Sequence, residues 1–351
     1  MDKNWSEMNK EMQALIAKKV TFKEGISKLL ELRKSLFDQI TQIVSTFPKE
    51  AFYQMPFAGA EGYHSKALAY SIWHIFRIED IVAHEMIAED QQILFSGGFL
   101  EVIHASSITT GNELAGDGIA AFSKQLNIQA LYLYAQEVKQ STNRILTSLE
   151  YPDLKRKFGE EMIEKLRNTH CVSNAQSASW LIDYWCGKDV LGLIRMPFSR
   201  HWIMHIEAMQ RIKNRLCRLA RNGVDPIAYC GFSCNHCFLS QWCGSCRTDY
   251  NTCSFATVSP DGKCPNAVCC REKSIDGCYE CGLLENCEKG FYTPSSDGAN
   301  AAKAQAMYIR KHGKKEFLKV QDRLHEKYDF AKTQEILGQD DQEGLRILEE
   351  S

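Results

Sequence analysis

The cysteines of this chain are concentrated in one short stretch, and this clustering limits what the stretch can fold into more than any other feature. Twelve of the 15 cysteines in the 351 residues lie between Cys230 and Cys287. The first residues, from Met1 to Gln13, lack both the basic start and the apolar run of a secretion signal, so we expect a cytoplasmic protein. Because the cytosol keeps thiols reduced, such a density favours metal thiolates over disulfides.

All twelve clustered cysteines are candidate metal ligands. Pairs separated by two residues, such as Cys243 and Cys246, place two thiolates within reach of one tetrahedral ion. The predicted ligands are Cys230, Cys234, Cys237, Cys243, Cys246, Cys253, Cys264, Cys269, Cys270, Cys278, Cys281 and Cys287. They could fill up to three four-cysteine zinc sites or hold iron–sulfur clusters. Redox disulfides, or a mixture of these arrangements, are a third alternative. Because large apolar residues are few in this segment, we expect metal to stabilise its fold.

The charge of the chain argues against nucleic acid as a partner. The formal net charge is -2, and residues 230–290 hold fewer basic than acidic residues, to which bound thiolates would add negative charge. No apolar run approaches the roughly 18 residues that a membrane-spanning helix needs. We therefore expect neither a nucleic-acid nor a membrane partner, and the sequence leaves the oligomeric state open.

The rest of the chain has the apolar spacing of helices. Apolar residues recur three and four apart over 21–45, 64–94, 128–149 and 198–219, and no run alternates as a strand does. This pattern predicts a mainly α protein with an antiparallel four-helix bundle over 1–222. Residues 99–127 and 153–196 are too long for bundle loops, so we expect short helices there.

A second domain is predicted over 227–351. The residues from Asn222 to Pro226 are typical of a helix end followed by a turn, which sets the boundary between the domains. This domain combines the cysteine-rich, metal-stabilised segment with C-terminal helices over 299–351, and residues 293–298 are expected to form a short linker.

Three histidines are predicted to form a second kind of metal site inside the bundle. His201 and His205 are four residues apart, so they lie one turn apart on one face of their helix, and that face continues through apolar residues. His74 interrupts another inward apolar stripe. Three convergent imidazoles would leave one open position on a metal, as in catalytic centres. The alternative is three core histidines bonded to backbone or carboxylate groups.

The run from Ser71 to Asp80 (SIWHIFRIED), with the later run from Arg200 to His205 (RHWIMH), resembles the DinB-like superfamily of four-helix-bundle metalloproteins. This resemblance covers roughly residues 20–221 and implies that His74, His201 and His205 bind a divalent metal. Several members of the superfamily are similar to S-transferases or isomerases that use low-molecular-weight thiols, and others resemble the iron-binding half of sulfoxide synthases. Residues 227–349 resemble an uncharacterised bacterial cysteine-rich domain family, which implies metal binding without an assigned reaction.

We therefore expect a metal-dependent thiol transferase. Its substrates would be a low-molecular-weight thiol and a small electrophile, with zinc, nickel or iron at the histidines and zinc or an iron–sulfur cluster at the cysteines. One alternative is a non-catalytic metal-sensing or protein-interaction module in which both centres are structural. Another is a non-haem iron enzyme, which would require iron and oxygen.

Overall fold

The structure is a computed structural model that describes residues 3–293 and 296–351, except for the side chain of Ser254. The described residues are mainly helical and contain no strand, only two isolated bridges, which confirms the predicted mainly α class. The chain divides into two compact units, Met1–Ser45 with Lys49–Ile212 and Thr46–Pro48 with Lys213–Ser351. Among the described residues, no helix is both long enough and apolar enough to cross a membrane.

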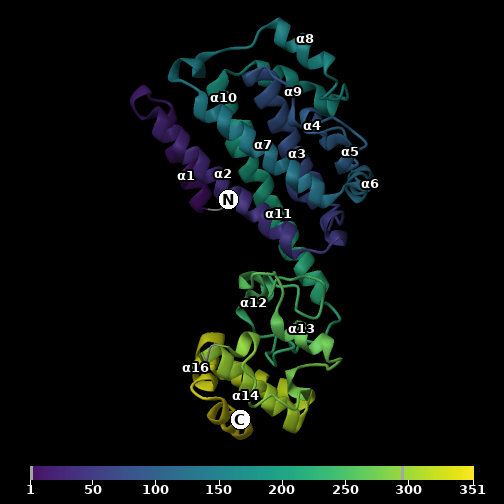
Figure 1. Cartoon of the computed structure of the whole chain (residues 1–351), viewed down its shortest axis with the longest axis vertical. Coiled ribbons are helices and arrows are strands. Elements are labelled where there is room, and N and C mark those ends of the chain that lie inside the picture. Colours follow the sequence, from purple (N-terminus) through teal and green to yellow (C-terminus); the bar gives the residue numbers. More distant parts are fainter. Residues whose placement is uncertain (1–2, 294–295) are drawn as a thin grey trace. The chain divides into compact units, whose positions relative to one another are not determined.

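Unit 1 contains four helices of 13 residues or more and the first part of a fifth, α11, whose residues from Lys213 onward belong to unit 2 (Figure 1). The predicted segments 21–45 and 128–149 match α2 and α7 almost to the residue, and the long predicted connections do carry short helices. The helices are α1 (Lys3–Ile16), α2 (Phe22–Thr46), α3 (Leu68–Asp80), α4 (Ile93–Ser96), α5 (Phe99–Ile103), α6 (Asp117–Gln125), α7 (Ile128–Ser148), α8 (Glu160–Asn168), α9 (Gln176–Cys186), α10 (Val190–Arg195) and α11 (His201–Arg221). Short 3₁₀ turns occupy Lys19–Thr21, Lys49–Phe52, Tyr63–Ser65 and Tyr151–Lys155.

Two predicted helices of unit 1 are less regular than their apolar spacing suggests. The segment 64–94 becomes α3 followed by a π-helical stretch, Ile81–Ala88, which ends where Glu89 adopts a left-handed conformation with φ 56°. The segment 198–219 begins with a π-helical turn, Met196–Arg200, and becomes α-helical only at His201. Pro197 lies in that turn and offers no backbone N–H, which disfavours a regular helix there.

One buried polar network joins α2, α3, α7 and α11. The Arg33 guanidinium on α2 donates to both carboxylate oxygens of Glu79 on α3, at 2.9 and 2.6 Å, and both side chains are fully buried. Arg33 Nε also donates to Asn143 Oδ1 on α7 at 2.8 Å, and Trp202 Nε1 on α11 donates to Glu79 Oε2 at 2.8 Å. A buried ion pair is tolerated only when its remaining polar atoms are bonded, and here they are.

Unit 2 pairs an irregular cysteine-rich segment with regular C-terminal helices. Residues 227–293 hold only short elements, α12 (Ser254–Val258), α13 (Pro265–Glu272) and the 3₁₀ turns Phe238–Gln241, Cys278–Glu280 and Gly290–Tyr292. The tail forms α14 (Asp297–His312), α15 (Lys314–Lys327), α16 (Phe330–Gly338) and α17 (Asp341–Glu350). Of the predicted linker 293–298, Pro294 and Ser295 lie outside the described residues, and Ser296 Oγ caps α14 by accepting from Ala299 N.

The cysteine-rich segment packs on α14. Cys270, Cys278 and Leu284 share a buried apolar cluster with a stripe of small residues on that helix, which includes Ala302 and Ala306. Gly231 has φ 98°, and a Cβ built there would lie 2.8 Å from Ala306 Cβ and 2.9 Å from Ala302 O. The backbone approaches the helix so closely that only glycine fits at this position.

Candidate metal centres

The three predicted histidines come from two helices of unit 1. His74 lies in the middle of α3, while His201 is the first residue of α11 and His205 follows one turn later. All three side chains are buried, with exposed fractions of 5%, 7% and 2%. Their positions follow from the helical spacing, because residues four apart lie above one another on one face of a helix.

The three imidazoles converge. One nitrogen from each lies within 4.8 Å of the others, and no other group of three or more His, Cys, Asp or Glu side chains in the described part of the chain comes this close. His74 Nε2 and His201 Nε2 are 3.2 Å apart. Metal–nitrogen bonds of about 2.0–2.1 Å in a tetrahedral site place two ligand nitrogens about 3.3 Å apart, so this pair already has the spacing of two ligands on one ion.

The nitrogens facing one another are available as ligands. His74 Nδ1–H donates to the Thr110 carbonyl at 2.8 Å, which leaves the lone pair of the neutral ring on Nε2, toward the other two histidines. Within the described residues, both ring nitrogens of His205 and Nδ1 of His201 lack a hydrogen-bond partner although they are buried. Unpaired buried nitrogens are costly, and a cation bound between the rings would satisfy the ones that face it.

Burial also keeps the three imidazoles neutral. It lowers the pKa of His74 to about 4, an effect that the nearby Lys66 ammonium reinforces. The pKa of His201 falls well below its usual value because of burial and the neighbouring His74, and the pKa of His205 falls likewise. A neutral imidazole is the form that binds a metal, so the site needs no deprotonation at neutral pH.

The loop 108–111 orients His74 and its neighbours on α3. Four consecutive backbone carbonyls of this loop each accept a hydrogen bond from a side chain on one face of α3. The pairs are Arg77 with Ile108 O (2.8 Å), Trp73 with Thr109 O (3.0 Å), His74 with Thr110 O (2.8 Å) and Tyr70 with Gly111 O (3.0 Å). Gly111 has φ 80°, and a Cβ there would lie 3.0 Å from the Tyr70 ring. The helical spacing of the four donors can be recognised in the sequence. Nothing in the sequence identifies the loop carbonyls that accept from them.

Tyr63 and Lys66 also lie near the histidines. The Tyr63 ring packs edge-on against His205 with ring centroids 4.5 Å apart, and 44% of Tyr63 is exposed to solvent. The half-buried Lys66 ammonium lies 5.6 Å from the Tyr70 ring centroid, and the Tyr70 ring stacks on His74. Burial lowers the pKa of Lys66. A cation and a partly exposed ring therefore lie near the histidines, and neither residue was among the predicted site residues.

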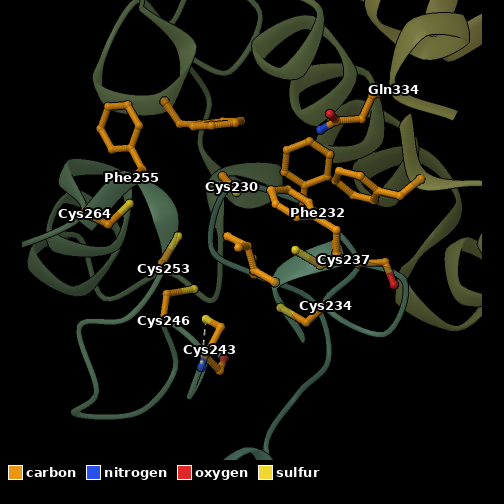
Figure 2. A pocket seen from close by; sticks show the side chains of 17 residues that line it. Cys230, Phe232, Cys234, Cys237, Cys243, Cys246, Cys253, Phe255, Cys264 and Gln334 are labelled. Carbon is orange, nitrogen blue, oxygen red and sulfur yellow. Dashed lines mark hydrogen bonds between the residues drawn. The ribbon is translucent and has the colours of Figure 1, made fainter. Parts of the chain in front are cut away.

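The twelve predicted cysteine ligands lie in unit 2 and divide between two cavities that share no lining residue, and a third cavity is lined by Cys246, Cys253 and Cys264 of the first set. The first cavity has a volume of about 110 Å³ and is lined by Cys230, Cys234, Cys237, Cys243, Cys246, Cys253 and Cys264, with several phenylalanines. Figure 2 shows Cys243, Cys246, Cys253 and Cys264 in a row along one side of this cavity and Cys234 and Cys237 on the other. The second has a volume of about 160 Å³ and is lined by Cys269, Cys270, Cys278, Cys281 and Cys287.

These thiols are free; Cys264, Cys270 and Cys278 are buried, and the other nine are half-buried. Burial raises the pKa of Cys234 to about 12, and it raises the pKa of Cys230 and Cys246 as well. Such thiols stay protonated at neutral pH unless a cation lies beside them. The cysteines described here form no disulfide, and no three of their sulfurs approach one another as closely as the histidine nitrogens do.

Comparisons with known proteins identify no family for this chain, so its function is inferred from its own geometry. No family model, curated protein or solved structure matches it. The resemblance of residues 20–221 to DinB-like proteins therefore stays a prediction, as does the resemblance of the cysteine-rich segment to a bacterial family. The three histidines and the cysteine-lined cavities are the features of the chain that indicate a function.

Proposed function

We propose that unit 1 is a DinB-like four-helix bundle and a thiol-dependent S-transferase. His74, His201 and His205 would hold one divalent metal ion, zinc, nickel or iron, and the substrates would be a low-molecular-weight thiol and a small electrophile. The observation that carries this proposal is the convergence of three buried, neutral imidazoles whose nitrogens lie within 4.8 Å of one another. Three protein ligands leave a fourth position for a substrate, as in catalytic rather than structural sites.

The chemistry fits this ligand set. Because neutral imidazoles leave a divalent ion its full charge, the ion when bound lowers the pKa of a thiol at its open position and makes the sulfur nucleophilic near neutral pH. Overall, the thiol sulfur bonds to the electrophilic carbon, the leaving group departs with its electron pair, and the thiol proton passes to solvent.

Residues of the chain would position the substrate and the ligands. The Thr110 carbonyl fixes the tautomer and orientation of His74 through its 2.8 Å hydrogen bond. The half-buried Lys66 ammonium lies near the same histidines, where it would attract a thiol that carries a carboxylate. The partly exposed Tyr63, packed on His205, would cover the site from solvent.

For the cysteine-rich segment we propose zinc or an iron–sulfur cluster with a structural role. The segment has short helices and free cysteines that line two cavities, and it lacks the long apolar helices that stabilise unit 1. Metal bound by thiolates contributes folding free energy directly in such small domains.

A second candidate is a non-catalytic, metal-sensing or protein-interaction module in which the histidine centre is structural as well. One observation favours it, because no histidine of the group is more than 7% exposed and a substrate must displace the covering residues to reach them. Activity separates the two candidates, since a structural centre gives none at any metal loading.

The test compares full-length protein with the His201→Ala variant and a matched control, His84→Ala. His84 is equally buried, but it bonds to Asp90 and lies outside the histidine group. Each protein is loaded with zinc, nickel or iron(II) and assayed with 1-chloro-2,4-dinitrobenzene and a panel of small thiols. We expect His201→Ala to fall to the background rate and His84→Ala to stay active. Equal activity in all three would contradict the proposal, and a reaction that needs iron and oxygen would favour a non-haem iron enzyme.

A further inference from the structure

We infer that the cysteine-rich segment holds two separate metal centres, and that the second is a tetrahedral zinc ion bound by Cys270, Cys278, Cys281 and Cys287. The inference builds on the proposal that this segment binds metal, and it specifies how many centres there are, where the second lies and which residues bind it. The division falls between Cys264 and Cys269, which are only five residues apart, and the spacing of the cysteines does not mark it.

The division into two centres follows from the cavities. Seven cysteines line one cavity and five line the other, and together they account for all twelve. Cys264, at the start of α13, belongs to the first set, while Cys269 and Cys270, near its end, belong to the second. Five or six residues of helix span about 8 Å, so Cys264 lies about that far along the helix axis from Cys269 and Cys270.

The distance between two sulfurs in the second cavity restricts the kind of centre. Cys270 Sγ and Cys278 Sγ are 3.8 Å apart. Two thiolates on one tetrahedral zinc, with bonds of about 2.3 Å, are separated by about 3.8 Å. A disulfide would need about 2.05 Å. In a cubane iron–sulfur cluster each thiolate binds a different iron, so the thiolates are farther apart than two ligands of one ion. The observed spacing therefore fits two ligands on one ion, as in a zinc site or on one iron of a two-iron cluster, and the metal analysis below tells zinc from iron.

Local backbone structure supplies the third ligand. Cys278 begins a 3₁₀ turn, and Cys281 N donates to Cys278 O at 3.0 Å. Side chains three residues apart in a 3₁₀ turn point the same way, so Cys278 and Cys281 both face the cavity. Cys287 lines the same cavity and completes a set of four. No third cysteine among the described residues lies within 4.8 Å of both Cys270 and Cys278, so binding requires Cys281 and Cys287 to rotate toward them.

The surroundings of this cavity suit a negatively charged centre. Lys273 Nζ donates to Cys281 Sγ at 3.3 Å, and Asn266 Nδ2 donates to Cys278 Sγ at 3.6 Å. A zinc ion with four thiolates carries a net charge of about -2, which the ammonium and the amide dipole stabilise. Cys269 is the spare thiol, because it precedes Cys270 on α13 and its side chain points about 100° away around the helix.

The test measures the metal content of full-length protein by elemental analysis. The variants are Cys270→Ser, Cys278→Ser and Cys278→His in the second cavity, Cys269→Ser as the matched control beside Cys270, and Cys246→Ser in the first cavity. We expect Cys270→Ser and Cys278→Ser each to lose one equivalent of zinc and Cys269→Ser to lose none. Cys278→His keeps a zinc ligand, so retention of zinc by this variant separates ligation from a general loss of folding. Cys246→Ser should keep the second zinc ion while losing the metal of the first cavity.

Three results would overturn the inference. If Cys246→Ser and Cys278→Ser lose the same metal, the segment holds a single centre, although it still binds metal. A Cys270–Cys278 disulfide in anaerobically purified protein would mean that the pair is a redox couple rather than a ligand pair. If every cysteine variant keeps the metal content of the wild type, the proposal that the segment binds metal fails, and the inference fails with it.

Discussion

The histidine group and the cysteine-rich segment differ in how their candidate ligands are positioned. His74, His201 and His205 project from long helices, and their nitrogens already lie at ligand spacing. The cysteines project from turns and short helices, and one pair of them, Cys270 and Cys278, has such a spacing. Helix packing therefore positions the first set of ligands, whereas bound metal would draw the second set together.

If both proposed centres bind metal, the metal would have a different role in each. In unit 1 the packed helices already position the three histidines, so an ion there could serve chemistry. In the cysteine-rich segment, which has only short helices, the free energy of metal binding would contribute to the free energy of folding. Four predictions test this comparison.

Removal of metal should unfold one region and spare the other. When full-length protein is treated with a strong chelator, we expect amide protection over residues 230–287 to fall by at least about a thousandfold, while α2, α3 and α7 keep theirs. Hydrogen exchange read by mass spectrometry measures both regions in one sample. Comparable loss in the three helices would show that unit 1 also depends on metal for its fold.

The buried Arg33–Glu79 pair should matter for unit 1 alone. We expect Arg33→Met to lower its free energy of unfolding by about 3–5 kcal/mol, because Glu79 is left as an unpaired buried charge. Lys34→Met is the matched control, since Lys34 is 73% exposed and its ion pair with Asp38 is worth about 0.5 kcal/mol or less. Urea unfolding followed by tryptophan fluorescence measures both variants. Equal effects would mean that the network adds little to the packing of the helices.

The loop that holds His74 can be disturbed without touching a ligand. Gly111→Ala places a methyl group against Tyr70 at a backbone conformation that suits glycine, so the Thr110 carbonyl must shift. We expect metal affinity of the histidine site to fall by about 10- to 100-fold. Gly116→Ala is the control, because Gly116 also has a positive φ but has open space around it. Competition with a chromophoric chelator measures affinity, and an equal loss in both variants would point to general backbone strain.

The smallest effect is expected at Lys66. If this ammonium attracts the thiol substrate, Lys66→Gln should raise KM for a thiol with a carboxylate by about two- to fivefold. It should leave KM for a neutral thiol unchanged and the metal content intact. Steady-state kinetics with mercaptoacetate and mercaptoethanol make the comparison, and an equal change for both thiols would assign Lys66 a structural role.

The sequence predicted the parts of this molecule that depend on local spacing. The bounds of α2 and α7, and the convergence of His201 with His205 on one face, follow from helical periodicity. The pairing of His74 with Thr110 O and of Arg33 with Glu79 joins residues 36 and 46 positions apart. No local pattern in the sequence selects these partners, because any buried carbonyl or carboxylate near the donor could accept the same hydrogen bond.

The cysteines illustrate the same limit. Their density indicated metal, but spacing along the chain does not show that Cys264 and Cys269, five residues apart, line different cavities. Cys264 precedes α13 and Cys269 lies on its second turn, and α13 is a short helix with Pro265 at its start. A short helix within a cysteine-rich segment has too few apolar residues for periodicity to reveal it.

The central claim is that the three histidines bind one metal ion. The most direct measurement is an anomalous difference map, collected at the absorption edge of the metal, from crystals of the full-length protein. We predict one peak among the imidazoles, in contact with His74 Nε2 and with one nitrogen each of His201 and His205, while His74 Nδ1 stays bonded to Thr110. A map with no peak there after loading with zinc, nickel and iron would show that these are core histidines and would contradict the account.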